Sequence, residues 1–159
     1  MWEGPMNAKD TAGVIAPPPL IYLAAAVLGL ILRFLAPTPF LPRGLAFVLG
    51  AVLIVIAVWL SAWGVRAMRR AGTSEKTSLP TTALVTTGPF RFSRNPLYVS
   101  LTLCYVGIAI AAQSIWSLAL LFVVLPAVQR GVIDREERYL ERRFGTDYVR
   151  YKKRVRRWI

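Results

Sequence analysis

Histidine is absent from the 159 residues of this chain, and cysteine occurs once, at Cys104. The lack of histidine excludes Ser-His-Asp triads, histidine-based acid–base catalysis and histidine-ligated metals. One cysteine can form neither an intramolecular disulfide nor a cysteine-based zinc or iron–sulfur site. We therefore expect no bound metal, and any chemistry must use carboxylates, arginine, tyrosine, asparagine, backbone groups or a cofactor.

Charged residues make up only 18% of the chain, whereas hydrophobic residues make up 55%. A soluble domain carries nearer a quarter charged residues. The apolar residues here come in long runs, which is typical of a membrane protein. The length is that of one domain, so we expect a single membrane domain over residues 1–159.

The basic residues give a net charge of +12 and lie beside the apolar runs. That placement is typical of loops held at an anionic membrane leaflet. It argues against nucleic acid as a partner, which would require a basic face on a soluble domain. We therefore expect the lipid bilayer to be the partner of the basic surface.

Four apolar segments predict an all-α integral membrane protein with four transmembrane helices. They cover residues 20–36, 44–64, 97–112 and 115–128. The last two are each shorter than the usual ~20 residues, and only Gln113 and Ser114 separate them. We expect them to form a tight antiparallel hairpin, with Pro126 bending its second arm.

Lysine and arginine are concentrated on one side of this expected topology. They fill the segment between spans two and three and the chain after span four, and Arg43 is the only basic residue that borders either of the other turns. The positive-inside rule therefore places both termini and the 65–96 segment in the cytoplasm. Within the domain, residues 1–78 hold two spans and a basic loop, and residues 79–159 hold the segments with specific polar chemistry.

The first such segment is a loop that runs from Leu84 to Tyr98 and enters the third span. Asn95 suits a helix N-cap and Pro96 suits the first helical position. On one interpretation, the pair does no more than start the helix. Alternatively, Arg94 and the free N–H groups at the helix N-terminus bind an anionic ligand such as a carboxylate. Both interpretations remain open on the residues alone.

The second segment follows span four and contains Glu136 and Glu137 beside an apolar helical stripe. Neither carboxylate has a basic residue three or four positions away on its own helix. Each therefore needs a partner from another element or from a cationic ligand. A structural ion pair with Arg130 or with the 65–96 loop is the alternative to a binding site.

The tail beyond Phe144 alternates aromatic and basic residues. Its apolar positions are Tyr148, Tyr151, Val155 and Trp158, with arginine and lysine between them. This pattern predicts a cytoplasmic interfacial helix that lies on the membrane surface.

The two polar segments, separated by a hairpin, resemble those of the isoprenylcysteine carboxyl methyltransferase family and the related phospholipid methyltransferases. The resemblance covers about residues 80–155. In the loop it rests on Leu84, Val85, Thr86, Gly88, Pro89, Arg94, Pro96 and Tyr98. In the C-terminal segment it rests on Glu136, Glu137, Leu140, Phe144, Gly145, Tyr148 and Tyr151.

This resemblance implies transfer of a methyl group from S-adenosylmethionine within the membrane. It implies that the loop, the start of span three and the Glu-Glu helix enclose that cofactor, with its amino group on Glu136 or Glu137 and its carboxylate at the N-terminus of span three. The implied cofactor-binding residues are Leu84, Val85, Gly88, Phe90, Asn95, Pro96, Tyr98, Glu136 and Glu137. The candidate catalytic residues are Arg94, Asn95 and Arg130.

The chain departs from the family pattern at Asn95, where many members have histidine, and at Phe90, where many have tyrosine. Asparagine cannot accept a proton at neutral pH. A carboxylate or thiolate acceptor needs no base at the transfer step, whereas an amine must first lose a proton. We therefore expect a lipidic or amphiphilic acceptor, with isoprenylcysteine-type carboxyl methylation as the leading class.

Other functions remain open. The same architecture could methylate a phospholipid amine or a small thiol. Membrane reductases that use nicotinamide cofactors resemble it in their hairpin-and-tail organisation. A non-catalytic membrane protein is the last alternative, in which the Glu-Glu pair only forms a salt bridge to the loop.

Overall fold

The computed structural model describes residues 13–73 and 81–159, and in these ranges the chain is helical without any strand. The prediction of an all-α protein is thus confirmed for the described part. The α-helices are α1 (Pro18–Leu35), α2 (Arg43–Arg70), α3 (Pro96–Ala111), α4 (Ile115–Val128) and α5 (Asp134–Arg154). A short 3₁₀ helix, η2 (Gly88–Arg91), precedes α3, and a π-helical turn, η3 (Gln129–Ile133), joins α4 to α5.

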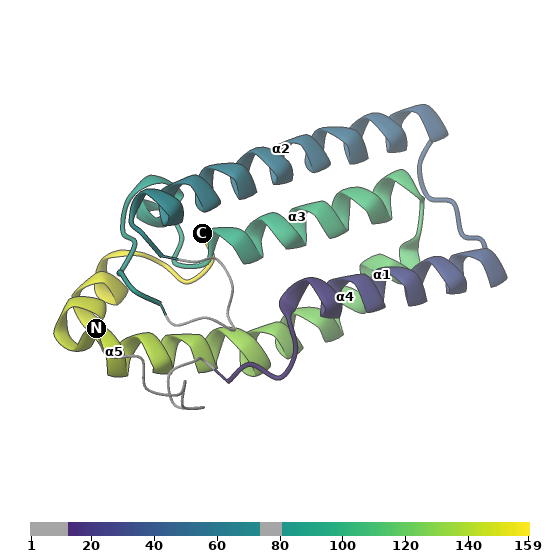
Figure 1. Ribbon diagram of the computed structural model, residues 1–159. Coiled ribbons are helices and arrows are strands. Elements are labelled where there is room, and N and C mark those ends of the chain that lie inside the picture. The colour runs from purple at the N-terminus through teal and green to yellow at the C-terminus, as the bar shows by residue number, and fades with distance from the viewer. Residues whose placement is uncertain (1–12, 74–80) are drawn as a thin grey trace.

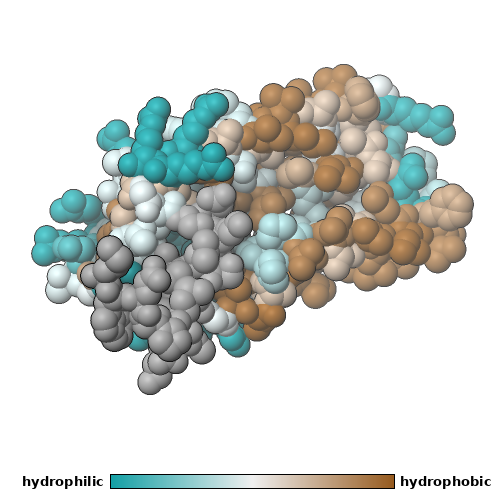
Figure 2. All heavy atoms as spheres, in the orientation of Figure 1, coloured by the Kyte–Doolittle hydropathy of each residue, from teal (hydrophilic) through white to brown (hydrophobic). Residues whose placement is uncertain are grey.

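The helices form two pairs, in which α2 packs mainly on α3 and α1 mainly on α4 (Figure 1). The helix α5 extends α4 beyond the bundle, at the end where α1 begins and α2 ends. In Figure 2 hydrophobic residues cover most of the bundle, and hydrophilic residues gather at its two ends, chiefly at the α5 end. This distribution is that of a bundle whose middle faces lipid.

Three helices are long and apolar enough to cross a membrane: Pro18–Leu35, Arg43–Arg70 and the continuous helix Ile115–Arg154. The predicted third span, α3, has 16 residues. It is about 24 Å long, which is less than the ~30 Å hydrocarbon thickness of a typical bilayer. Three helices are therefore long and apolar enough to span a membrane, and the count of four spans and their topology stay predictions.

The C-terminal region differs from the expected separate interfacial helix. After Val128 the chain stays helical: it passes through the π-helical turn η3 and continues as α5. The helix α5 is kinked at Gly145 (φ 52°) and ends at Arg154. Residues 155–159 then fold back toward the start of α3. Trp158 packs against the core and lies beyond the end of the helix. The prediction of one helix through Trp158 is therefore wrong.

The tyrosines of this region also face the protein. Tyr148 is 1% exposed and Tyr151 is 8% exposed, and the Tyr151 hydroxyl donates a hydrogen bond of 2.7 Å to the carbonyl oxygen of Phe90. A buried tyrosine hydroxyl needs such a partner, and the motif loop supplies it. The aromatic residues that suggested a membrane-surface helix therefore attach α5 to the loop.

The opposite end of the bundle is held by Gln113, which lies between α3 and α4. Its side-chain oxygen accepts hydrogen bonds from the backbone N–H groups of Phe40 and Leu41, each at 3.2 Å. Ser114 caps α4 by accepting from the N–H of Ser117. The predicted hairpin turn is present, and it also fixes the turn between α1 and α2.

Close packing of α2 on α3 depends on glycine. A Cβ atom at Gly50 would lie 2.6 Å from the Gly107 carbonyl oxygen and 2.6 Å from the Ala111 Cβ. Because Gly50 on α2 and Gly107 and Ala111 on α3 are all small, the backbones of the two helices approach closely, as is common in membrane helix pairs.

We expect Gly50→Val to destabilise the protein by about 1–3 kcal/mol or more, because the added side chain overpacks the α2–α3 contact. Gly44→Val is the matched control, since nothing lies within 4 Å of a Cβ placed at Gly44 on the same helix. Unfolding of both variants by denaturant in detergent measures the difference. Equal stability of the two variants would contradict the packing of α2 on α3.

Candidate functional site

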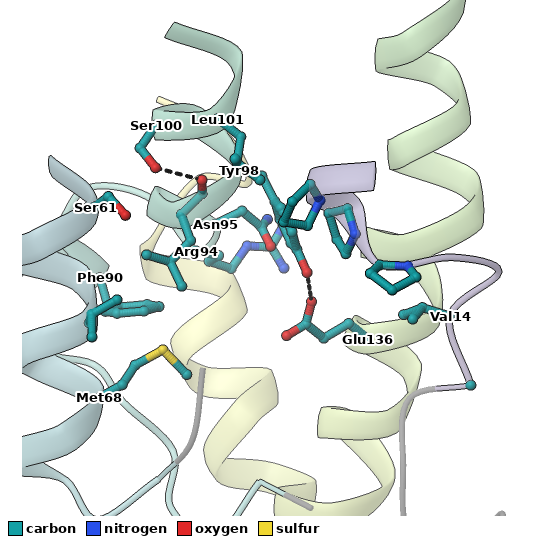
Figure 3. A pocket seen from close by; sticks show the side chains of 16 residues that line it. Val14, Ser61, Met68, Phe90, Arg94, Asn95, Tyr98, Ser100, Leu101 and Glu136 are labelled. Atoms are coloured by element: carbon teal, nitrogen blue, oxygen red, sulfur yellow. Dashed lines mark hydrogen bonds between the residues drawn. The ribbon is translucent and has the colours of Figure 1, made fainter. Parts of the chain in front are cut away.

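A cavity of about 690 Å³ lies where the starts of α1, α3 and α5 meet the end of α2. Small-molecule sites usually have about 300–1,000 Å³. Its lining is mainly apolar, with a few polar groups that converge on it, and in Figure 3 Met68 and Phe90 lie on one side with Val14 and Glu136 on the other. The lining residues are Gly13, Val14, Pro17, Pro18, Pro19, Ser61, Val65, Met68, Phe90, Arg94, Asn95, Leu97, Tyr98, Ser100, Leu101 and Glu136.

The glycine and proline of the motif loop set its path along α2. Gly88 has φ +61°, and a Cβ there would lie 3.2 Å from the Ala67 Cβ and 3.3 Å from the Trp63 Nε1. Only glycine adopts this conformation readily in so close a contact. Pro89 is buried next to it. The turn η2 is thereby held against the end of α2, and Phe90 reaches the cavity.

Asn95 occupies the N-cap position of α3 and Pro96 its first position, as the sequence suggested, but the side chain of Asn95 does not cap the helix. The side-chain Nδ2 instead donates to the backbone carbonyl oxygen of Arg157 at 3.0 Å. The local pattern Asn-Pro predicted a side-chain cap, whereas the side-chain amide of Asn95 donates its hydrogen bond to a segment that is distant in sequence.

We expect Asn95→Asp to lower the stability of the ligand-free protein by about 1–3 kcal/mol, the cost of a buried group left without a hydrogen-bond partner. Aspartate has no N–H to donate to Arg157 and would bring a negative charge close to its carbonyl oxygen. Asn95→Ala removes the donor without adding charge and should cost less. Thermal unfolding without ligand compares the three proteins, and wild-type stability of Asn95→Asp would contradict this contact.

Glu136 and Glu137, adjacent in sequence, lie in different environments. Glu136 lines the cavity, and its Oε2 accepts a hydrogen bond of 2.7 Å from the Tyr98 hydroxyl (Figure 3). It lies in the polar α5, beyond the apolar part of the long helix. Burial raises the pKa of the Glu136 carboxyl, the hydrogen bond from Tyr98 lowers it, and the charge of Glu137 raises it further.

Glu137 is held by cations from two other segments and from its own helix. Its carboxylate accepts two hydrogen bonds from Arg157, at 3.0 and 2.7 Å. Arg94 Nη1 lies 3.1 Å from its Oε1, and Lys152 Nζ lies 4.0 Å from its Oε2. The side chains of Glu137 and Arg94 are only 6% and 9% exposed. The expectation of a partner from outside the local helix is thus met for Glu137 by a structural ion pair.

Arg94 keeps unused hydrogen-bonding capacity at the cavity. Its Nε and Nη1 are buried without a hydrogen-bond partner among residues 13–73 and 81–159. The contact of Nη1 with Glu137 is an ion pair at 3.1 Å but not a hydrogen bond. Buried donors of this kind are rare unless a ligand, ion or water satisfies them. Arg94 lines the cavity, so its positive charge and its two unpartnered donors lie next to whatever occupies it.

Neighbouring charges also act on Tyr148, which lies beside this ion pair. Burial raises the pKa of the Tyr148 phenol, and Glu137 raises it further, while Arg94 lowers it. The phenol therefore stays protonated at neutral pH and adds no negative charge beside Arg94. The negative charge paired with the Arg94 guanidinium is the carboxylate of Glu137, at 3.1 Å.

The structure brings together part of the predicted site. Phe90, Arg94, Asn95, Tyr98 and Glu136 all line the cavity. The other predicted residues do not line it; these are Leu84, Val85, Gly88, Pro96, Arg130 and Glu137. Their assignment to cofactor binding or catalysis stays a prediction from the resemblance.

The predicted residues that do not line the cavity lie in several other places. Leu84 lies in a separate cleft with Arg91, Arg150 and Arg154. Arg130 is exposed on η3, while Val85 and Pro96 are buried. Gly88 contacts α2, as described above.

Sequence reasoning missed the wall formed by α2, which supplies Ser61, Val65 and Met68. Ser61, a polar residue near the end of an apolar helix, was the one local signal. It also missed Arg157, which was grouped with the basic tail. Nothing near Arg157 in sequence distinguishes it from Arg154 or Arg156.

Comparison with known proteins now places the chain. The sequence model of the phospholipid methyltransferase family matches residues 45–147, which is more than half of the chain. The chain belongs to the phospholipid methyltransferase family. An uncharacterized protein of Haemophilus influenzae is 41% identical over 68 residues, which cover 40% of this chain and all of that protein.

Membership in the phospholipid methyltransferase family bears out the resemblance drawn from the two motifs. The family consists of integral-membrane methyltransferases, in agreement with the apolar helices. Its match includes the motif loop, the hairpin and both glutamates, and it ends before Arg157. The fold-back segment that holds Glu137 and Asn95 thus lies outside the matched range.

Proposed function

We propose that the protein transfers a methyl group from S-adenosylmethionine to a lipidic or amphiphilic acceptor in the cavity. The observation that carries this proposal is the pair of opposite charges in a mainly apolar cavity: the carboxylate of Glu136 and the incompletely bonded guanidinium of Arg94. An amino acid group, with one ammonium and one carboxylate, complements such a pair. The family supports the same cofactor.

The residues present fit S-adenosylmethionine in charge and in size. Glu136 would hold its amino group, and one of the free donors of Arg94, Nε or Nη1, would hold its carboxylate. When bound, it supplies an electrophilic methyl group on a sulfonium. Val65, Met68 and Leu101 give the cavity apolar walls, and exclusion of water with in-line positioning is what this reaction needs most from a protein.

A carboxylate acceptor of the isoprenylcysteine type is the leading substrate class. Methylation of a carboxylate needs no proton removal, and the chain has no histidine to remove one. The side chain of Asn95, which stands at the histidine position of many relatives, donates to a backbone carbonyl. It therefore acts in positioning and not as a base. The apolar lining suits a prenyl or acyl chain.

A phospholipid amine is the second candidate, and the description of the family favours it. An ammonium headgroup must lose a proton before it accepts a methyl group. Glu136 is the carboxylate among the described lining residues, and burial raises its pKa, which makes it a stronger base than an ordinary glutamate. A phospholipid acceptor would thus need Glu136 to contact the headgroup.

The decisive experiment measures binding and transfer with purified protein in lipid nanodiscs. Calorimetry should show saturable binding of S-adenosylmethionine. Radiolabelled methyl groups should then pass to an S-prenylated N-acetylcysteine in preference to phosphatidylethanolamine or a small alkyl thiol. Preference for phosphatidylethanolamine would select the second candidate, and absence of S-adenosylmethionine binding would refute the proposed function.

We also propose that the cavity opens on the cytoplasmic side, where S-adenosylmethionine is available. The basic loops support this orientation. In a Cys104→Ala background, a cysteine at Thr38, in the exposed turn before α2, should react with an impermeant maleimide on intact cells. A cysteine at Arg143, exposed on α5, should react only after permeabilisation. The reverse labelling would contradict the orientation.

A further inference from the structure

The fold-back segment, residues 155–159, is attached to the motif loop through its backbone. The carbonyl oxygen of Arg156 accepts from the N–H of Arg94 at 2.9 Å. The carbonyl oxygen of Arg157 accepts from Asn95 Nδ2 at 3.0 Å and from Ser93 Oγ at 3.2 Å. Three consecutive loop residues are thus fixed by two carbonyl groups that follow the last helix.

The side chain of Arg157 reaches α5 from the same place. Its Nε and Nη2 bind the two oxygens of Glu137, and its Nη1 lies 3.0 Å from Asp134 Oδ1. The hydrogen bond with Glu137, together with the charges of Glu137 and Asp134, raises the pKa of Arg157, so it stays charged. A bidentate arginine fixes both the position and the plane of a carboxylate.

This fixed plane determines what Arg94 can bind. Arg157 donates hydrogen bonds to both oxygens of Glu137, and the ion pair of Arg94 with Glu137 is a contact of 3.1 Å that is not a hydrogen bond. A freely rotating Glu137 could turn and accept a hydrogen bond from one of the two free nitrogens of Arg94. The third cation near Glu137, Lys152, is 4.0 Å away and 38% exposed, so it is a weak substitute for Arg157.

We propose that Arg157 is a positioning residue that restrains Glu137 and thereby keeps the guanidinium of Arg94 available to the carboxylate of the bound ligand. This inference rests on the proposed function, because the ligand is the amino acid group of S-adenosylmethionine. Arg157 itself does not line the cavity. It acts through Glu137 and, by its carbonyl group, through Asn95.

The test compares two ligands that differ only in the carboxylate: S-adenosylmethionine and decarboxylated S-adenosylmethionine. Calorimetry on the full chain in detergent should show that wild type prefers the first by about tenfold or more, as expected for hydrogen bonds to a charged group. In Arg157→Ala this ratio should fall toward one, because Glu137 then binds Arg94. A purely structural role would weaken both ligands alike and leave the ratio unchanged.

Two further variants make the result decisive. Arg157→Lys can contact only part of the Glu137 and Asp134 carboxylates, so it should give an intermediate ratio, and it serves as the test if Arg157→Ala does not fold. Arg156→Ala removes an exposed neighbouring charge and should keep the wild-type ratio. A wild-type ratio in both Arg157 variants, or a wild-type protein that binds S-adenosylmethionine without preferring the carboxylate, overturns the proposal. A wild type that binds neither ligand refutes the proposed function instead.

Discussion

Glu137→Gln is expected to lower the free energy of unfolding by about 3–5 kcal/mol, the cost of removing one partner from a buried ion pair. Glutamine keeps the shape of the side chain but leaves Arg94, which is 9% exposed, without its counter-charge. Arg157 retains Asp134 as a partner. The loss therefore falls mainly on Arg94, which cannot become neutral.

The matched control for this variant is Glu141→Gln on the same helix. Glu141 is 45% exposed, and its ion-pair partner within the described part of the chain is the partly exposed Lys152, at 3.5 Å. An exposed pair of this kind contributes about 0–1 kcal/mol. Denaturant unfolding of both variants without ligand gives the comparison. Equal losses in the two would show that the Glu137 cluster is no more stabilising than a surface pair.

Glu136→Gln is expected to have the opposite profile, with weak binding and nearly unchanged stability. The proposed contact with the amino group of S-adenosylmethionine is a hydrogen bond to a charged group, so its loss should cost about 1.5–3 kcal/mol of binding free energy. This corresponds to a rise of about ten- to a hundredfold in the dissociation constant. Glutamine still accepts the hydrogen bond from Tyr98 and avoids the cost of a buried charge.

Calorimetry and ligand-free unfolding on the same sample separate binding from folding for this variant. Tyr98→Phe is the companion variant, since it keeps the Glu136 charge but removes the hydroxyl that orients it at 2.7 Å. It should weaken binding less than Glu136→Gln. Wild-type affinity in Glu136→Gln would exclude Glu136 as the cofactor's amino-group ligand.

The different environments of Glu136 and Glu137 separate what the sequence could predict from what it could not. Apolar runs predicted the helices α1, α3 and α4 to within two residues at each end, and the start of α2, which continues to Arg70 beyond the predicted end at residue 64. They did so because a helix must satisfy its backbone within itself wherever lipid surrounds it. The lack of local basic partners correctly predicted that Glu137 has a partner elsewhere. Both are properties of residues that are close together in the chain.

Other features were decided by contacts between distant residues. One helical position of about 100° separates Glu136 and Glu137, and only the contacts of α5 with distant residues, Tyr98 for Glu136 and Arg157 for Glu137, determined which of them faces the cavity. Asn95 appears to local rules as a helix cap, but the carbonyl of Arg157, 62 residues later, accepts its hydrogen bond.

The sequence by itself determined the all-helical membrane fold, the family and the two polar segments that build the site. The tertiary structure decided the division of labour within them: Glu136 at the cavity, Glu137 in a buried ion pair, and Arg157 as the residue that joins the two segments. The physical reason is that helix formation depends on local periodicity, whereas the partner of a buried charge depends on how the chain folds back.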